Sequence, residues 1–122
     1  MKGRDKEYLE AIYALERESK IARVRDIAEY LGIAKSSVSV ALKSLVQKGL
    51  VEHDRYSYVS LTSRGREMAE SLYAASRRLN RFFLKLGLDS PSADEVAECI
   101  CYNVSDNVLK RLLGVTDVAD DS

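Results

Sequence analysis

The sequence predicts a mostly α-helical protein that carries one small β-hairpin. Apolar residues recur at helical spacing through most of the chain. Two of the predicted helices are separated only by a short turn that begins at Gly32. Between positions 50 and 61 the pattern changes to the alternation of two short strands. Helix, turn, helix and hairpin in this order predict an N-terminal winged helix-turn-helix, with a helical domain after it.

Length and composition are those of an ordinary globular chain. The 122 residues suit one domain, or a small domain with a helical extension, and 46% of them are hydrophobic. No apolar run approaches the ~20 residues of a membrane-spanning helix, and no apolar signal core follows the N-terminus. We therefore expect a cytoplasmic protein without a membrane partner.

Charge is divided unequally along a chain whose formal net charge is zero. Residues 1–66 carry 13 lysines and arginines against 9 acidic residues, whereas residues 67–122 carry 6 against 10. The first part is therefore the one suited to an anionic partner such as a phosphate backbone. We predict a winged-helix domain over 1–66, a further helical domain over 67–114, and an acidic, frayed tail over 115–122.

Three helices and a short strand precede the hairpin. Helical spacing of apolar residues predicts helices over about 4–18, 24–31 and 35–48, and glycines end the second and third. The segment 21–24 is short and tolerates β structure, so it is a candidate strand that pairs with the hairpin. The hairpin strands themselves are predicted at 50–54 and 57–61.

The third predicted helix has a distinctive outward face. Its buried stripe is expected to contain Val38, Leu42, Leu45 and Val46. The opposite face has no acidic residue and presents Lys35, Ser36, Ser37, Ser39, Val40, Lys43 and Gln47. Serines have poor helix propensity, so this face contributes little to stability. It suits a helix that approaches phosphates and base edges closely, although a capping role for Ser36 and Ser37 is the alternative.

The hairpin tip, Arg55 and Tyr56, extends the predicted DNA-binding surface. An arginine at this place suits a phosphate or the minor groove. The predicted DNA-contacting residues are Arg23, Arg25, Lys35, Ser36, Ser37, Ser39, Lys43, Arg55 and Tyr56.

A long helix follows the hairpin. Thr62 is its predicted cap and Leu86 its approximate end. Its apolar seam contains Met68, Leu72, Leu79, Phe82 and Phe83. Because the helix is longer than a winged helix needs, part of this seam is expected to meet another surface.

Two shorter helices are predicted to complete the chain. Ser90 is the expected N-cap of the first, with Pro91 at the start of a helix that covers about 92–104. Ser105 is the expected cap of a last helix over about 106–113.

The two cysteines, Cys99 and Cys101, lie two positions apart in one of these helices. Residues at this spacing point ~200° apart, so the thiols cannot easily form a disulfide with each other. This is consistent with a reducing compartment. We expect one of the two thiols to be buried.

Several motifs together resemble one family. They are Glu7-Tyr-Leu-Glu10-Ala-Ile-Tyr13, Arg23-Val-Arg-Asp-Ile-Ala-Glu-Tyr-Leu-Gly32, Lys35-Ser-Ser-Val-Ser39, Leu45-Val-Gln-Lys-Gly-Leu-Val-Glu-His53 and Leu61-Thr-x-x-Gly65. Over about residues 5–113 the chain resembles the metal-dependent repressors of the diphtheria toxin repressor and manganese transport regulator family. Its short length resembles the two-domain manganese-regulator branch.

The resemblance implies a function and its control. It implies a homodimer, joined through the C-terminal helices, that binds a palindromic operator in double-stranded DNA and represses metal-homeostasis genes. It also implies a divalent transition metal (Fe²⁺, Mn²⁺ or Zn²⁺) held between the first helix and the dimerisation helices. A metal bound by both modules would fix their relative orientation and therefore the half-site spacing.

The metal ligands are where this sequence departs from the family. Glu7 and Glu10 stand at the first-helix positions, at i and i+3, and are good oxygen ligands. Ser76 and Tyr102 occupy the two positions at which the family carries histidines. A neutral serine or tyrosine is a poor ligand for a divalent metal.

The next predicted helix supplies Glu98 and Cys101, also at i and i+3, with Asp94 one turn earlier. A thiolate would shift the preference of the site from Mn²⁺ towards Fe²⁺, Zn²⁺ or Co²⁺. The expected ligand set is Glu7, Glu10, Glu98 and Cys101. The alternative is a lost site whose carboxylates are ordinary surface groups.

Three functions are compatible with these features. The first is a metal-activated DNA-binding repressor. The second is a regulator that binds DNA independently of metal, or that senses thiol oxidation through Cys99 or Cys101. The third is a protein-interaction module, which the polar face of the third helix disfavours because interaction faces carry larger apolar anchors. An enzyme is not expected, since no nucleophile–base pair is evident and the only histidine, His53, lies in the hairpin; nor is an RNA partner.

Overall fold

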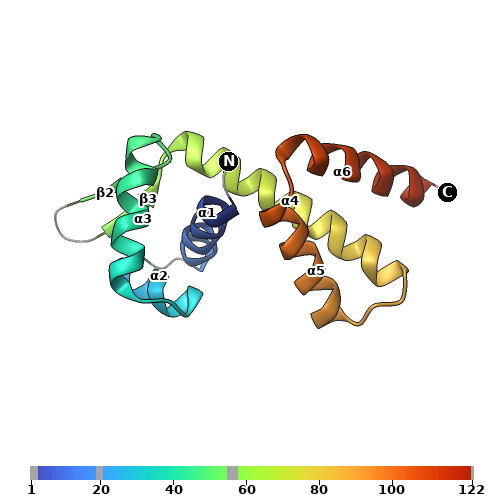
Figure 1. The fold of residues 1–122 in the computed structure, drawn as a ribbon, viewed down its shortest axis with the longest axis horizontal. Coiled ribbons are helices and arrows are strands. Elements are labelled where there is room, and N and C mark those ends of the chain that lie inside the picture. The colour runs from blue at the N-terminus through green and yellow to red at the C-terminus, as the bar shows by residue number, and fades with distance from the viewer. Residues whose placement is uncertain (1–2, 19–20, 55–57, 122) are drawn as a thin grey trace. The chain divides into compact units, whose positions relative to one another are not determined.

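The computed structural model describes residues 3–18, 21–54 and 58–121 (Figure 1). The elements within these ranges are α1 (Gly3–Arg17), β1 (Ala22–Arg23), α2 (Val24–Leu31), α3 (Lys35–Gln47), β2 (Val51–His53), β3 (Tyr58–Leu61), α4 (Ser63–Lys85), α5 (Ser90–Asn103) and α6 (Asp106–Asp121). The predicted fold class, mostly α with a winged helix-turn-helix at the N-terminus, is confirmed. The described residues divide into two compact units, Asp5–Glu70 and a second one that contains 71–121 together with Gly3 and Arg4.

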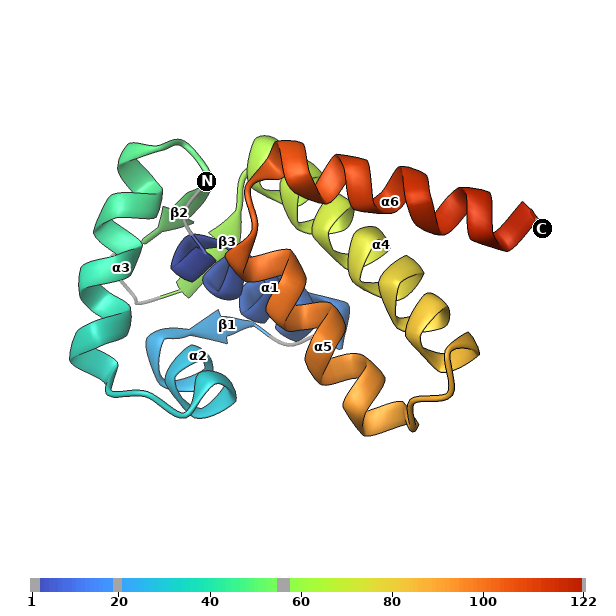
Figure 2. The ribbon, with the colours of Figure 1, turned by 45° about the vertical axis from the view of Figure 1, so that its right-hand side comes forward.

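The N-terminal unit is built around α1, α2 and α3, and Figure 2 shows the short connection from α2 to α3. Its core joins the apolar stripes of these helices to the inward-facing residues of the strands. The largest fully buried apolar side chains of this core are Tyr8, Leu9, Ile12, Ile27, Val38, Leu42, Leu45 and Val51. Three of the four residues predicted for the buried stripe of the third helix, Val38, Leu42 and Leu45, are thus confirmed.

The three strands form one antiparallel sheet in the order β1-β3-β2. The predicted strand before α2 is confirmed, because Ala22 lies opposite Val59 and Arg23 opposite Tyr58. The predicted tip residues Arg55 and Tyr56 lie outside the described residues.

The turn between α2 and α3 depends on Gly32. This residue has a φ of 67°, in the left-handed region that a side chain disfavours. The N–H groups of Gly32 and Ile33 donate to the carbonyl oxygens of Glu29 and Ala28, at 3.3 Å and 3.1 Å. The helix therefore ends at the predicted residue, and α3 can begin three residues later.

The end of α3 differs from the prediction at one residue. Val46 is 43% exposed, whereas Val38, Leu42 and Leu45 are fully buried. The prediction that Val46 belongs to the buried stripe is wrong. At ~100° per residue, Val46 lies at the edge of the arc that the other three share.

Contacts of Thr62 and Gly65 join the start of α4 to the end of α3. The Thr62 hydroxyl donates to the carbonyl oxygen of Gly49 at 2.7 Å and accepts from the N–H of Gly65 at 3.0 Å. The Thr62 N–H donates to the carbonyl oxygen of Leu50 at 3.1 Å. Thr62 is therefore the cap that the sequence predicted, and it also ties the helix start to the chain that precedes β2.

Glu16, near the end of α1, holds the opposite side of the same junction. One carboxylate oxygen accepts from the N–H of Leu61 at 3.1 Å, and the other lies 2.7 Å from the Arg66 guanidinium. A single side chain thus links α1 to the end of β3 and to the first turn of α4.

The Glu16→Ala substitution should lower the free energy of unfolding by about 1–2 kcal/mol, because it removes both links and leaves the Leu61 N–H without this acceptor. Arg66→Ala should cost less than about 1 kcal/mol, because it removes only a partly exposed ion pair. Urea unfolding followed by circular dichroism measures both. Equal losses in the two variants would contradict the role given to the Leu61 hydrogen bond.

The C-terminal unit contains the remainder of α4 with α5 and α6. Its core is formed by Ala75, Leu79, Ala97, Cys101 and Leu109. The Asn80 amide donates to Asp94 at 2.5 Å and the Arg78 guanidinium donates to the Leu113 carbonyl oxygen at 3.0 Å. These bonds tie α4 to α5 and to α6.

The N-terminal cap of α5 differs from the prediction, whereas that of α6 agrees with it. The N-cap of α5 is Asp89, one residue before the predicted Ser90, so Pro91 is the second residue of the helix and not the first. The predicted cap at Ser105 is confirmed, since its hydroxyl accepts from the N–H of Val108 at 3.2 Å.

The prediction that the last helix ends near Leu113 is wrong. Helix α6 continues to Asp121. Gly114 has no positive φ and so does not stop the helix. The buried Thr116 donates its hydroxyl to the Leu113 carbonyl oxygen at 2.8 Å, which satisfies both groups inside the helix.

Candidate nucleic-acid interface

The serines at the start of α3 do not act as helix caps. The N-cap residue is Ala34, which offers no side-chain hydrogen bond to the helix. Ser36 and Ser37 are the second and third residues of the helix, and both are exposed. The capping alternative therefore does not explain why this face is rich in serine.

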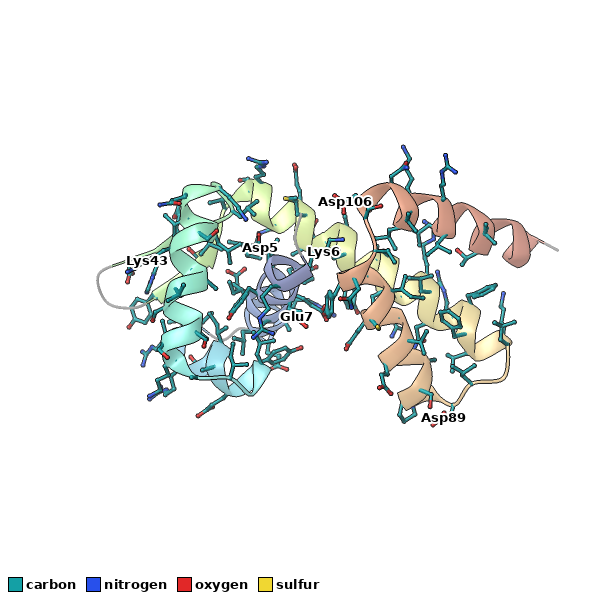
Figure 3. All side chains as sticks on the ribbon, in the orientation of Figure 1. Asp5, Lys6, Glu7, Lys43, Asp89 and Asp106 are labelled. Carbon is teal, nitrogen blue, oxygen red and sulfur yellow. The ribbon has the colours of Figure 1, made fainter. Side chains whose placement is uncertain are left out.

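Helix α3 presents a continuous outward face that carries no negative charge. Its exposed residues on this face are Lys35, Ser36, Ser37, Val40, Lys43 and Gln47, while Ser39 is half-buried. Figure 3 shows Lys43 projecting from α3 on the side away from α1. Short polar side chains of this kind suit close approach to base edges in a major groove, and the lysines suit contacts with phosphates.

Arg23 is held in place beside the sheet. Its guanidinium lies 5.0 Å from the centre of the Tyr58 ring, and one of its nitrogens donates to the Tyr58 hydroxyl at 3.3 Å. Its backbone N–H donates to the Asp26 carboxylate at 3.2 Å. An arginine stacked on an aromatic ring loses little further freedom when it binds a phosphate.

Tyr58 was not among the residues predicted to serve DNA binding. The signal that could have found it was the predicted pairing of 21–24 with the hairpin, which brings a hairpin residue opposite Arg23. Arg25 is exposed, and its guanidinium lies 3.9 Å from the Asp26 carboxylate.

The described part of the hairpin is closed by Asp54 and Tyr58. The N–H of Asp54 donates to the carbonyl oxygen of Tyr58, and the N–H of Tyr58 donates to the Asp54 carboxylate, both at 3.0 Å. These two bonds join the residue that follows β2 to the first residue of β3.

The predicted metal ligands belong to two different units. Glu7 and Glu10 lie one turn apart on α1, both half-buried, in the N-terminal unit. Glu98 and Cys101 lie one turn apart on α5, in the C-terminal unit. Within the described ranges, no group of three or more His, Cys, Asp or Glu side chains is arranged to hold a metal.

The donor chemistry of these residues is mixed. The three carboxylates are oxygen donors that fit Mn²⁺ or Fe²⁺. The Cys101 side chain, by contrast, is 1% exposed inside the apolar core of the C-terminal unit. Cys99 is exposed whereas Cys101 is buried, so the prediction that one of the two thiols is buried is confirmed. Ser76 and Tyr102 are half-buried.

In the part of the chain that the structure describes, none of the helices is both long and apolar enough to cross a membrane.

Comparison with known proteins finds related transcriptional regulators. Residues 3–59 match the family model described as "Iron dependent repressor, N-terminal DNA binding domain". The transcriptional regulator MntR of Bacillus subtilis (strain 168) is 31% identical over 106 residues, which cover 87% of this chain and 75% of that protein. MntR of Bacillus velezensis (strain DSM 23117 / BGSC 10A6 / LMG 26770 / FZB42) is 30% identical over 115 residues, which cover 94% and 81%.

Solved structures give the same result. The manganese regulator SloR is 29% identical with a TM-score of 0.75, over 93% of this chain and 53% of that chain. A manganese-dependent transcriptional repressor in complex with manganese is 26% identical with a TM-score of 0.78, over 93% and 52%. This chain therefore spans about half the length of each of these two structures.

These relatives are named as transcriptional regulators, and none of them as an enzyme. The matches cover both units of the chain, and the family model covers the outward face of α3. The chain belongs to the iron-dependent repressor family of metal-dependent, DNA-binding transcriptional regulators, the family that includes the transcriptional regulator MntR.

Proposed function

We propose that the protein is a homodimeric, sequence-specific repressor of metal-homeostasis genes that acts in the cytoplasm and responds to a divalent transition metal. The observation that carries the DNA-binding part is the outward face of α3, which is exposed, basic and free of acidic residues. A face of this kind suits the major groove of an operator.

Each group of DNA-contacting residues has a proposed role. Lys35, Lys43 and Arg25 neutralise phosphates, and Arg23 does so from its position on the Tyr58 ring. Ser36, Ser37 and Ser39 let the helix approach the bases closely. Arg55 and Tyr56 remain the proposed contacts of the hairpin tip.

Self-association is proposed for the C-terminal unit. Its exposed large apolar residues are Leu84, Leu86, Val108 and Val115, which are 40%, 62%, 43% and 60% exposed. Their burial against a second copy would supply the hydrophobic contribution that dimer formation requires. A two-fold dimer presents two copies of α3, so the operator would be palindromic.

The proposed metal ligands are Glu7, Glu10, Glu98 and Cys101, and the proposed ions are Fe²⁺, Mn²⁺ and Zn²⁺. The half-buried Glu7 and Glu10 would supply oxygen donors from α1, and the exposed Glu98 would supply one from α5.

Operator affinity measured with chelator and with each metal in turn tests this control. We expect metal to strengthen DNA binding by about tenfold or more in the wild type, and we expect Glu10→Ala to abolish this response. Glu95→Ala, which removes an exposed carboxylate from α5, serves as the matched control and should respond as the wild type does. Fluorescence anisotropy with a labelled operator duplex gives the affinities.

A wild-type protein that binds equally well with chelator and with every metal would remove metal control from this proposal. The alternative would then be a metal-independent regulator, or a thiol-sensing one that uses the exposed Cys99. Binding compared under oxidising and reducing conditions separates these two. Because Cys101 is buried, the metal response of Cys101→Ala has to be read together with its unfolding free energy.

A further inference from the structure

Val40 is the most exposed large apolar residue in the part of the chain that the structure describes, at 69%. It lies in the middle of α3, on the side opposite the buried Val38, Leu42 and Leu45. A valine at an exposed helical position contributes no core packing and has modest helix propensity. Stability therefore gives no reason for an apolar side chain here.

The neighbours of Val40 leave its side chain prominent. In a helix, the residues that flank a position on the same face are those three and four positions away. For Val40 these are Ser36, Ser37, Lys43 and Ser44. Three of the four are short serines, so the isopropyl group projects from a low polar surface.

An apolar side chain at the centre of this face can read only one feature of the major groove. Donors and acceptors on base edges require polar partners, and valine has none. The apolar group of the major groove is the 5-methyl group of thymine. The serines and lysines around Val40 are suited to polar contacts, whereas Val40 is suited to an apolar contact.

We infer that Val40 contacts the 5-methyl group of a thymine, and that each half-site of the operator carries a T·A pair at this point. The inference rests on the proposed DNA-binding function and adds to it a specificity-determining residue and the base that this residue recognises. Polar residues of α3 position the helix, whereas Val40 discriminates thymine from the other bases by apolar contact.

Deoxyuridine tests this contact because it pairs as thymidine does but lacks the 5-methyl group. Operator duplexes are first selected from a random-sequence pool with the full-length protein. Each thymine of the selected duplex is then replaced by uracil, and Kd is measured by fluorescence anisotropy. We expect one position in each half-site at which uracil weakens wild-type binding about fourfold, the change that corresponds to ~0.8 kcal/mol for one buried methyl-sized group.

Val40→Ala should bind the thymine duplex several-fold more weakly and should bind thymine and uracil duplexes equally at that position. Alanine favours the helix, so α3 should remain folded in this variant. Val46→Ala is the matched control, since Val46 is an exposed valine on another side of the same helix. It should retain the wild-type preference for thymine.

Wild-type binding that is indifferent to every uracil substitution, or a Val40→Ala variant that keeps the full preference, would overturn the inference while leaving DNA binding in place. If no duplex is enriched from the pool, the proposed function fails, and this inference fails with it.

Discussion

Ser37→Glu should weaken operator binding by about tenfold or more at each half-site, because a carboxylate would enter a surface that otherwise carries no negative charge. Ser37 is exposed and is the third residue of α3. At that position near the helix N-terminus a glutamate is favourable for helix stability. The loss would therefore come from repulsion by the phosphates and not from unfolding of the helix.

Ser63→Glu provides the control for this experiment. Ser63 is an exposed serine in the first turn of α4, so the change adds the same charge at a comparable helix start. We expect its effect on Kd to be several-fold smaller. Affinity measured across a range of salt concentrations should show the effect of Ser37→Glu shrinking as salt rises. Unchanged binding by Ser37→Glu would mean that α3 does not lie in the groove.

Gly65→Ala should lower the free energy of unfolding by roughly 1–3 kcal/mol, because a Cβ at this position would collide with the carbonyl oxygen of Leu50. The added Cβ would meet backbone atoms of Leu50, so no flexible side chain can move aside to relieve the collision. The Thr62 bonds to Gly49 and Leu50 hold the two segments at this distance. Relief of the collision would have to weaken these bonds.

The same substitution at Gly114 should have the opposite sign. Gly114 lies inside α6 without a positive φ, and a Cβ there would meet nothing within 4 Å. Gly114→Ala should therefore be neutral or stabilise the protein by up to about 1 kcal/mol. Chemical denaturation of both variants measures the contrast, and a Gly65→Ala protein as stable as the wild type would show that the close approach to Leu50 is not required.

The side of the molecule that we propose faces DNA could be predicted from the sequence to a large extent. The outward face of α3 follows from helical periodicity and from residue chemistry, both of which are local properties. The turn at Gly32 and the cap at Thr62 are local in the same way. The described part of the hairpin and the strand before α2 could also be placed, since their pairing needed only adjacent segments.

The candidate metal site could be predicted only as a set of residues. The resemblance of motifs supplied Glu7, Glu10, Glu98 and Cys101, but their suitability as ligands depends on burial and on distances between segments far apart in the chain. Burial of Cys101 among Ala75, Leu79, Ala97 and Leu109 is a property of how α4, α5 and α6 pack. Local pattern contains no information of this kind.

By itself, the sequence determined the elements, their order and the chemistry of the face that α3 presents, because these depend on residues within a few positions of one another. Only the tertiary structure decided that Val46 is exposed, that Tyr58 supports Arg23 and that Gly65 touches Leu50. It also decided that Gly114 continues α6, whereas Gly32 ends α2 as the sequence predicted. Glycine permits both conformations, and the packing of the surrounding chain selects between them.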